Sequence, residues 1–328
     1  MKYLKCTPQK LLSLLLIFLA ANAFSKSPVE TYGHLAVVGN KIVGSQGNTA
    51  SLAGPSFFWS NTGWGAEIFY NSDVVRHLKT EWNASLIRAA IGGEGPGGYN
   101  EDPKGNYQRA SALADAAIAE GLYVIIDWHT HHAEDRPDLA IEFFSRIATQ
   151  YGKHPNVIYE IYNEPLDNTD WKTTIKPYAE TVIAAIRKID PDNLIVVGTQ
   201  TWSQDVDIAA NAPITGYDNI AYALHFYAGT HKQELRDKAE IALNKGIALM
   251  VTEWGTVNAD GDGDVATESV EEWLTFIKKH ELSFCTWSMH NKKEGASILK
   301  PNTKPDGKWT DDDLTKNGLY LKKIISNW

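Results

Sequence analysis

The stretch Val157-Ile158-Tyr159-Glu160-Ile161-Tyr162-Asn163-Glu164-Pro165 shows the pattern that decides the fold of this chain. It begins as a mostly apolar, β-branched and aromatic run, which is typical of a buried strand, and it ends in polar residues. Seven other stretches of the 328 residues share this design. The full set predicts eight strands, near Ser51–Trp59, Ser85–Ala90, Tyr123–Trp128, Val157–Tyr162, Leu194–Gly198, Ile220–His225, Ala248–Thr252 and Phe284–Ser288.

Amphipathic stretches of helical period lie between these strands and after the last one. They predict helices over Ser72–Glu81, Gln108–Glu120, Leu139–Tyr151, Ile175–Ile189, Gln233–Asn244, Glu268–Lys279 and Leu314–Ile325. Strands that alternate with helices indicate parallel pairing with crossovers. The count of eight, and the absence of a Gly-x-Gly-x-x-Gly after the first strand, favour a closed barrel over an open dinucleotide-binding sheet. We therefore expect an α/β fold, a single-domain (β/α)8 TIM barrel over residues 51–328.

The first 23 residues have the features of a secretory signal peptide. Lys2, Lys5 and Lys10 precede an apolar run over residues 11–20, and Ala21-Asn22-Ala23 supplies a small-x-small cleavage site. We expect residues 1–23 to be removed and the protein to be secreted to the extracellular space. Residues 24–50 would then form an N-terminal extension with short strand character.

The charge balance excludes some classes of partner. Removal of residues 1–23, which hold three lysines and no acidic residue, changes the formal net charge from −9 to −12. An acidic protein is poorly suited to binding nucleic acid or anionic membranes, so we expect neither as a partner. We also expect the protein to be a monomer. Cys285 is the one cysteine left, which predicts a buried thiol. Eleven Trp and fourteen Tyr offer flat faces on which sugar rings can stack.

Polar or aromatic residues follow seven of the eight predicted strands. They are Arg88, Asp127-Trp128-His129, Asn163-Glu164, Thr201-Trp202-Ser203, His225-Phe226-Tyr227, Glu253-Trp254 and Trp287-Ser288. In a barrel all these strand ends meet on one face, which is where barrel enzymes have their active sites. Polarity at one strand exit is common, but its recurrence at seven strands predicts a site.

Two glutamates on this face suggest the chemistry. Paired carboxylates hydrolyse glycosidic bonds, because one protonates the leaving oxygen while the other attacks the anomeric carbon or activates water. Glu164 and Glu253 must then differ in protonation at one pH. The permanent charge of Arg88 would favour an ionised Glu253, and Asn163 would bind a sugar hydroxyl beside the reacting carbon.

Several stretches together resemble glycoside hydrolase family five, and within it secreted bacterial endo-β-1,4-glucanases. They are residues 157–165, Gly198-Thr199 through Trp202-Ser203-Gln204-Asp205-Val206, His225-Phe226-Tyr227-Ala228-Gly229-Thr230-His231, and Val251-Thr252-Glu253-Trp254-Gly255-Thr256. The resemblance runs from Leu52 to Trp328. It implies a retaining enzyme that cuts internal β-1,4 bonds of cellulose by double displacement. Glu164 would be the proton donor, and Glu253 would be the nucleophile.

The resemblance also implies a set of substrate-binding residues. Arg88 and Tyr227 would contact the nucleophile; His129, Asn163 and His225 would line the subsite of cleavage; Trp287 would stack under the sugar there, and Trp202 on the leaving-group side. Tyr99, Trp64, Ala259, Lys293 and Glu294 match positions in the glycone-side subsites. The chain departs from the family pattern after the first strand, where Phe57-Phe58-Trp59-Ser60-Asn61 stands in place of a frequent His. No substrate-binding residue is assigned to this stretch.

Metal and cofactor sites are not expected. Asp260-Gly261-Asp262-Gly263-Asp264 with Glu271 has calcium-loop spacing, but Val265 stands where that loop needs glycine. His129, His131 and His132 lack the further ligands of a zinc site. Two functional alternatives stay open, namely a β-mannanase or mixed-linkage glucanase on the same scaffold, and a non-catalytic carbohydrate-binding barrel.

Overall fold

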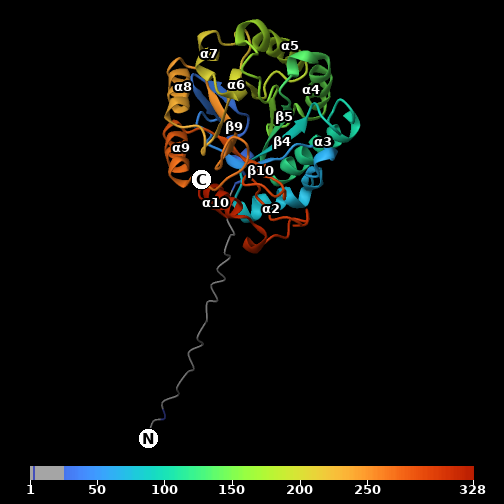
Figure 1. The fold of residues 1–328 in the computed structure, drawn as a ribbon, viewed down its shortest axis with the longest axis vertical. Helices are drawn as coiled ribbons and strands as arrows, with labels where there is room; N and C mark the ends of the chain where they lie inside the picture. Colours follow the sequence, from blue (N-terminus) through green and yellow to red (C-terminus); the bar gives the residue numbers. More distant parts are fainter. Residues whose placement is uncertain (1–2, 4–25) are drawn as a thin grey trace.

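The computed structural model describes residue 3 and residues 26–328 of the chain. In this part eight parallel strands close into a barrel surrounded by helices (Figure 1). The strands are β3 (Ala53–Phe57), β4 (Leu86–Gly92), β5 (Tyr123–His129), β6 (Val157–Glu160), β7 (Ile195–Val197), β8 (Ile220–Tyr227), β9 (Leu249–Gly255) and β10 (Phe284–Met289). Strand β10 pairs with β3 and closes the ring. The predicted (β/α)8 barrel and its eight strands are confirmed.

The main helices pack around the outside of the barrel (Figure 1). They are α2 (Ser72–Trp82), α3 (Pro103–Glu120), α4 (Pro137–Tyr151), α5 (Lys176–Arg187), α8 (Gln233–Asn244), α9 (Thr267–His280) and α10 (Lys316–Ser326). Each overlaps one of the seven predicted helical segments. The structure adds α6 (Gln200–Ser203) and α7 (Val206–Asn211) between β7 and β8, where no helix was predicted.

Helix α4 illustrates how the sequence forms these elements. Pro137 occupies its first turn, where a missing backbone N–H costs nothing. Phe143, Phe144, Ile147 and Tyr151 are buried at spacings of three and four, so one face of the helix packs against the barrel. The other main helices bury an apolar face in a similar way.

The interior of the barrel changes character from one end to the other. Inward-facing residues recur every second position along a strand, so each strand contributes successive layers. The lower layers are aliphatic and include Leu86, Ile125, Ile158 and Ala223. Two residues further along the same strands come Arg88, Asp127, Glu160 and His225, all buried. The charged layer therefore lies toward the carboxyl ends of the strands.

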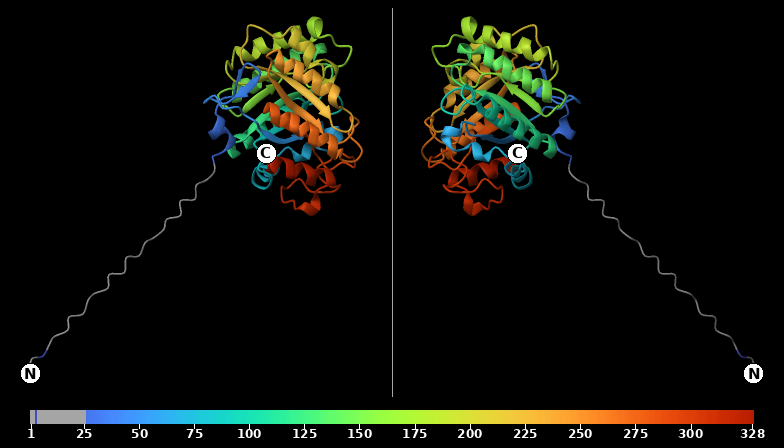
Figure 2. Two further views of the ribbon diagram at one scale, coloured as in Figure 1. Left: turned by 90° about the vertical axis from the view of Figure 1, so that its left-hand side faces the viewer. Right: turned by 90° about the vertical axis from the view of Figure 1, so that its right-hand side faces the viewer.

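The opposite end of the barrel is covered by the N-terminal segment, dark blue in Figure 2. This segment comprises α1 (Pro28–Tyr32) and an antiparallel hairpin of β1 (Ala36–Val38) and β2 (Lys41–Val43). Leu35 and Ile42 pack with the aliphatic residues of the lower interior. The predicted signal peptide, apart from residue 3, lies outside the described residues.

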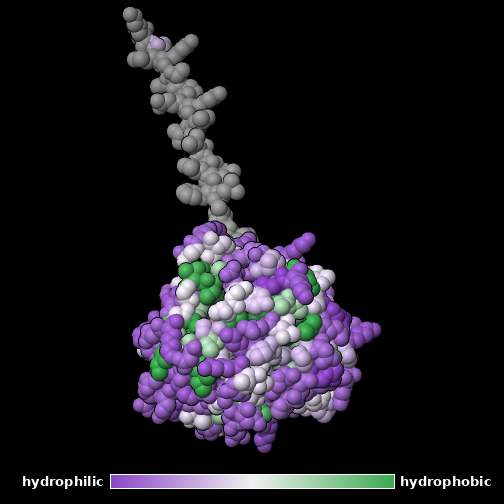
Figure 3. Space-filling view, turned by 90° about the horizontal axis from the view of Figure 1, so that it is seen from above, coloured by the Kyte–Doolittle hydropathy of each residue, from purple (hydrophilic) through white to green (hydrophobic). Residues whose placement is uncertain are grey.

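The surface shows no large apolar face in the view of Figure 3, where apolar residues form small, separate green patches among hydrophilic ones. Scattered apolar residues of this kind are normal on a protein surface. Within residue 3 and residues 26–328, none of the helices is both long and apolar enough to cross a membrane.

Candidate active site

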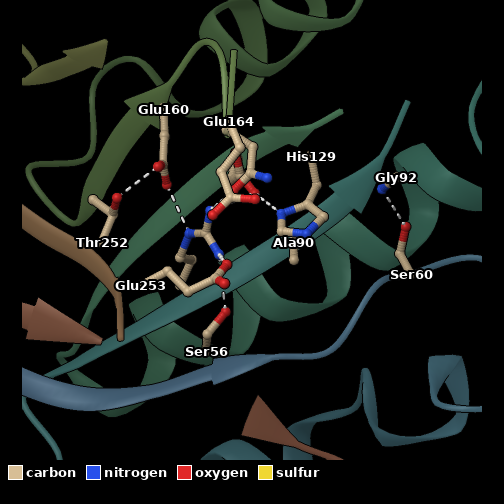
Figure 4. A network of polar contacts seen from close by, with 12 residues as sticks. Ser56, Ser60, Ala90, Gly92, His129, Glu160, Glu164, Thr252 and Glu253 are labelled. Atoms are coloured by element: carbon tan, nitrogen blue, oxygen red, sulfur yellow. Dashed lines mark hydrogen bonds and ion pairs between the residues drawn. The ribbon is translucent and has the colours of Figure 1, made fainter. Parts of the chain in front are cut away.

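The two candidate glutamates face one another at the carboxyl end of the barrel (Figure 4). Glu253 belongs to β9, and Glu164 follows the end of β6. A carboxylate oxygen of each lies within 4.8 Å of the other and of a ring nitrogen of His225. The side chain of Glu253 is 5% exposed and that of Glu164 is 14% exposed, so the two carboxylates meet in a largely buried space with one open side.

Arg88 on β4 lies under this pair, fully buried. Its Nη1 donates to Oε2 of Glu253 at 3.0 Å, and its Nε donates to Oε2 of Glu160 at 2.7 Å. Its Nη2 lies 2.9 Å from Oδ2 of Asp127 and donates to Oδ1 of Asn163 at 2.6 Å. Burial alone lowers the pKa of Arg88, but the three carboxylates outweigh it and hold the pKa well above its ordinary value. The guanidinium is therefore a fixed positive charge.

Both oxygens of Glu253 are held by donors from other strands. Oε2 accepts from Arg88, and Oε1 accepts from the Tyr227 hydroxyl at 2.8 Å. Burial raises the pKa of Glu253, the charge of Glu164 adds to the rise, and His225, Arg88 and Tyr227 oppose it. The donors therefore offset part of the cost of a buried carboxylate and orient it toward Glu164.

Glu164 has different partners. Its Oε1 lies 3.0 Å from Nδ1 of His225, and its Oε2 lies 3.7 Å from Nδ1 of His131. Nε2 of His225 lies 2.8 Å from the Thr252 hydroxyl, which in turn donates to Oε1 of Glu160 at 2.6 Å. Burial lowers the pKa of His225, but its contacts with Glu160 and Glu164 prevail and raise that pKa to about 9. A charged His225 thus lies beside Glu164.

The side chain of Asn163 has one amide donor without a protein partner. Its Oδ1 accepts from Arg88, which fixes the orientation of the amide. Its Nδ2 is buried and has no hydrogen-bond partner among the described residues. A buried amide donor without a partner is costly unless a ligand or water completes it. Asn163 precedes Glu164 and shares the guanidinium of Arg88 with Glu253, so its free donor belongs to the same network as the carboxylate pair.

An aromatic wall borders one side of the site. The rings of Trp287 and His129 stack at 5.3 Å with a 6° interplanar angle, and Trp59 meets His129 edge-on at 4.1 Å. Trp64 packs against Trp59 at 4.6 Å. Nδ1 of His129 forms a hydrogen bond of 2.6 Å with Oδ2 of Asp127. Burial and the nearby charge of Arg88 hold the pKa of His129 well below its ordinary value. His129 is therefore neutral.

A pocket lies on the other side of the carboxylate pair. It is lined by Glu164, Trp202, Tyr227, Glu253 and Ala259, among others. Trp202 is 38% exposed, an unusual exposure for an indole. Ala259 lines the same pocket as Trp202. The sequence analysis placed Trp202 on the leaving-group side and Ala259 in the glycone-side subsites.

Two further predicted binding residues, Tyr99 and Lys293, differ in burial. Tyr99 is fully buried between Trp128 and Phe143 and has no exposed surface with which to contact a sugar, so that prediction is wrong. Lys293 is exposed and has no hydrogen bond or ion pair in the described structure.

The neighbouring Lys292 lies against the aromatic wall instead. Its ammonium lies 4.3 Å from the ring centroid of Phe58 and 3.2 Å from Oε2 of Glu294. Phe58 in turn contacts Trp287 and Trp64, at 5.3 and 6.3 Å between ring centroids. Lys292 is therefore a further candidate beside the predicted Lys293, and Glu294 lies beside the wall.

The sequence analysis also gave no role to four residues that complete the network: Asp127, Glu160, Thr252 and His131. A signal for Glu160 existed, because a carboxylate inside an apolar strand at an inward-facing position needs a buried partner. Thr252 and His131 carry no such signal, because their roles depend on which strands become neighbours.

Among the described residues, one group of side chains has the spacing of a metal site. It consists of Glu164, His225 and Glu253. Both ring nitrogens of His225 already lie within hydrogen-bond distance of protein oxygens. The carboxylates likewise have protein donors. The arrangement is thus complete as a hydrogen-bonded site. It offers a pair of carboxylates that differ in exposure and in donors, and both line the same pocket.

Comparisons with known proteins agree with this geometry. The model of the family Cellulase (glycosyl hydrolase family 5) matches residues 43–293. Endoglucanase Z of Dickeya dadantii (strain 3937) is 53% identical over 294 residues, which are 90% of this chain and 66% of that protein. An endoglucanase of Clostridium saccharobutylicum is 42% identical over 317 residues, 95% of this chain and 70% of that protein. The chain thus spans about two thirds of the length of these curated relatives.

Solved structures show the same likeness. A structure from Cytophaga hutchinsonii superposes with a TM-score of 0.89 at 48% identity, covering 92% of this chain and 96% of that one. The catalytic domain of a Thermobifida fusca endoglucanase, in a variant form in complex with cellotetraose, gives a TM-score of 0.86 at 30% identity, covering 92% of this chain and 99% of that one.

Proposed function

The chain belongs to the cellulase family, glycosyl hydrolase family 5, and on that premise we propose that it is a retaining endo-β-1,4-glucanase with Glu164 as proton donor and Glu253 as nucleophile. The observation that carries the proposal is the approach of the two carboxylates, whose oxygens lie within 4.8 Å. Retaining enzymes hold their carboxyl groups about 5–5.5 Å apart, whereas inverting enzymes leave about 6.5–9.5 Å for a water molecule.

The first step follows from the partners of each carboxylate. Arg88 and Tyr227 donate to Glu253 and orient it, so in its ionised form it attacks the anomeric carbon, and the bond from that carbon to the leaving oxygen breaks. Glu164 gives its proton to the leaving oxygen at the same time. The products are a glycosyl ester on Glu253, an ionised Glu164 and a released sugar with a free hydroxyl.

The second step reverses these roles. Water enters from the side of the released sugar, and Glu164 removes its proton while the oxygen attacks the anomeric carbon. The ester bond to Glu253 breaks, and both carboxyl groups return to their starting states. Two inversions at one carbon leave its configuration unchanged. His225 beside Glu164 stabilises the carboxylate form between the steps, at 3.0 Å.

The binding residues support a glucan that continues past both sides of the pair. His129 and Trp287 belong to the aromatic wall, and Trp202 lines the pocket at the carboxylate pair. Asn163, the residue before Glu164, has a free amide donor. Flat indole faces suit the apolar faces of β-linked glucose units. The printed names of the relatives, endoglucanases in each case, and the cellotetraose bound by the Thermobifida fusca domain support β-1,4-glucan as the substrate.

Initial rates of reducing-sugar release on carboxymethylcellulose, lichenan and mannan test this function. We expect carboxymethylcellulose to be cut, and Glu253→Ala to release no sugar while it keeps the circular dichroism spectrum of the wild type. Preference for mannan or for lichenan alone would favour the alternative hydrolases. Binding without release by the wild type would favour a non-catalytic barrel. Activity should survive dialysis against EDTA, because no cofactor takes part in the proposed steps.

Secretion forms a separate part of the proposal. The basic and apolar residues 1–23 support export followed by cleavage after Ala23. N-terminal sequencing of protein collected from the culture medium should read from Phe24. Retention of the full chain in the cell would contradict it. We further propose that the mature protein is a monomer with no nucleic-acid or membrane partner, which sedimentation at several concentrations would test.

A further inference from the structure

The turn that carries Trp202 has an unusual backbone. Thr201, Trp202 and Ser203 have φ angles of 59°, 53° and 57°, the left-handed region that residues with a Cβ rarely adopt. None of the three is glycine or asparagine. Three such residues in a row persist only where the surroundings hold them, and strain of this kind gathers at functional sites.

What holds this turn is the loop that bears Glu164. The Ser203 hydroxyl donates to the Asn163 carbonyl at 2.7 Å, and the Trp202 N–H donates to the Pro165 carbonyl at 2.8 Å. The Thr201 N–H donates to the carbonyl of residue 166 at 3.4 Å, and the Gln200 side-chain amide donates to that of residue 167 at 2.7 Å. Four successive residues of the turn therefore bind four carbonyls of residues 163–167.

The contact at Ser203 is the most enclosed of these. Ser203 is fully buried, and its hydroxyl also accepts from the Thr199 N–H at 3.2 Å. The backbone reaches this position because Gly198 has no side chain. A Cβ at Gly198 would lie 2.1 Å from the Tyr162 carbonyl oxygen, which is a clash. The end of β7 is thus packed directly on the backbone that leads to Glu164.

The same loop is held from its other side by the segment after β5. The N–H groups of Asn163 and Glu164 donate to the carbonyls of Trp128 and Thr130 at 3.2 and 3.4 Å. Nδ1 of His131 lies 3.1 Å from the Glu164 carbonyl oxygen. The backbone around Glu164 is therefore fixed between two neighbours, and the left-handed turn is one of them.

We propose that residues 200–203 act as a clamp on the loop that bears the proton donor, and that Ser203 is the positioning residue through which the clamp aims Glu164. The inference rests on the proposed function of Glu164. A general acid must lie within hydrogen-bond reach of the leaving oxygen, and a displacement of about 1 Å can cost about 100-fold in rate. Loss of the Ser203 hydroxyl should therefore weaken protonation of the leaving group more than other steps.

Two aryl β-cellobiosides separate these effects. Phenol, with a pKa of about 10 like tyrosine, leaves well only when it is protonated. The 2,4-dinitrophenolate ion is a far weaker base and leaves without help. Both carry a single ring on the leaving side, so stacking on Trp202 is similar for the two. The value of kcat/KM reports the step in which the glycosidic bond breaks.

For Ser203→Ala we expect kcat/KM to fall about tenfold on the phenyl substrate and by less than about twofold on the dinitrophenyl substrate. Ser283→Ala is the matched control. Its hydroxyl is equally buried, donates to the Ala50 carbonyl at 2.8 Å and accepts from the Leu52 N–H at 3.0 Å, but it lies at the opposite end of the barrel. Ser283→Ala should change kcat/KM on both substrates by less than about twofold, because residue 283 is far from the reacting groups.

Equal losses on both substrates, or no loss on either, would overturn the clamp. Should Ser203→Ala fail to fold, Gln200→Ala removes a more exposed contact of the same clamp and should show the same preference for the phenyl substrate, at a smaller size. Glu164→Ala provides the reference for a missing acid, with a loss of about 100-fold or more on the phenyl substrate alone. If Glu164→Ala lost both rates equally, the proposed role of Glu164 would fail, whatever Ser203 does.

Discussion

Nη1 of Arg88 lies 3.0 Å from Oε2 of Glu253, and the same guanidinium reaches four further side chains around it. A planar group with five donors can make these contacts at once, and an ammonium cannot. The orientation of the nucleophile, the fixed charge beside it and the free amide donor of Asn163 all depend on this one residue.

Replacement of Arg88 by lysine should therefore be damaging although it keeps the charge. We expect Arg88→Lys to lower kcat/KM on the order of 100-fold, the typical cost of removing a preorganised charge-stabilising donor. The melting temperature should also fall, because buried carboxylates lose their partners. Steady-state kinetics and thermal unfolding would measure the two effects. A variant with wild-type kinetics would show that Arg88 has a structural role only.

The acidic limb of the pH–rate profile should follow Glu253. Burial raises the pKa of this carboxyl, so the attacking carboxylate is lost as pH falls through a value above the ordinary glutamate range. Tyr227→Phe removes a donor to the charged form, which raises that pKa further. A hydrogen bond to a charged group contributes about 1.5–3 kcal/mol, so the limb should move up by about one to two pH units. A limb that stays in place or moves down would contradict this assignment.

The stability of the fold should depend on pH through His225. Its pKa is raised to about 9 in the folded protein, above the ordinary value near 6.5, so its protonation stabilises the fold. The contribution is complete below pH of about 6.5 and is lost as pH rises toward about 9, with a size on the order of 3 kcal/mol. Urea unfolding from pH 6 to 9 would show the decline.

His225→Asn is the control for this decline, because it removes the titrating group. Burial also raises the pKa of the Cys285 thiol, which lowers stability at the top of the same window in both proteins. The difference between wild type and variant therefore isolates His225. An equal slope in both proteins would refute the contribution of His225.

Two adjacent lysines test the placement of the aromatic wall. Lys292→Ala removes an ammonium that lies over Phe58 and beside Glu294, so KM for cellotetraose should rise about fivefold. Lys293→Ala removes a charge without such contacts and should change KM by less than about twofold. Initial rates over a range of cellotetraose concentrations would compare them. A larger effect at Lys293 would favour Lys293 over Lys292 as the binding residue.

Much of the fold was predictable because buried parallel strands are continuous apolar runs and their helices have strong periodicity. The polar ends of those strands also predicted which residues gather at the rim. Inward alternation places Arg88, Asp127, Glu160 and His225 in one layer, so the charged network follows from register once the barrel is assumed.

The loops were less predictable, for physical reasons. The left-handed turn at 201–203 has no glycine to mark it, since its conformation is imposed by the loop at 163–167. Helix α7 has six residues, too few for a period to show. The error at Tyr99 also lies beyond a strand end, where alternation no longer fixes side-chain direction.

The central claim is that Glu253 forms a covalent bond to the sugar. Incubation with 2,4-dinitrophenyl 2-deoxy-2-fluoro-β-cellobioside slows the second step and should trap the ester, because fluorine destabilises both oxocarbenium-like transition states while the good leaving group preserves the first step. Mass spectrometry of peptides from the labelled protein is the most direct measurement. We predict one fluorocellobiosyl group, on the peptide that contains Glu253. Label on another residue, or no label while the wild type hydrolyses the unfluorinated substrate, would contradict the account.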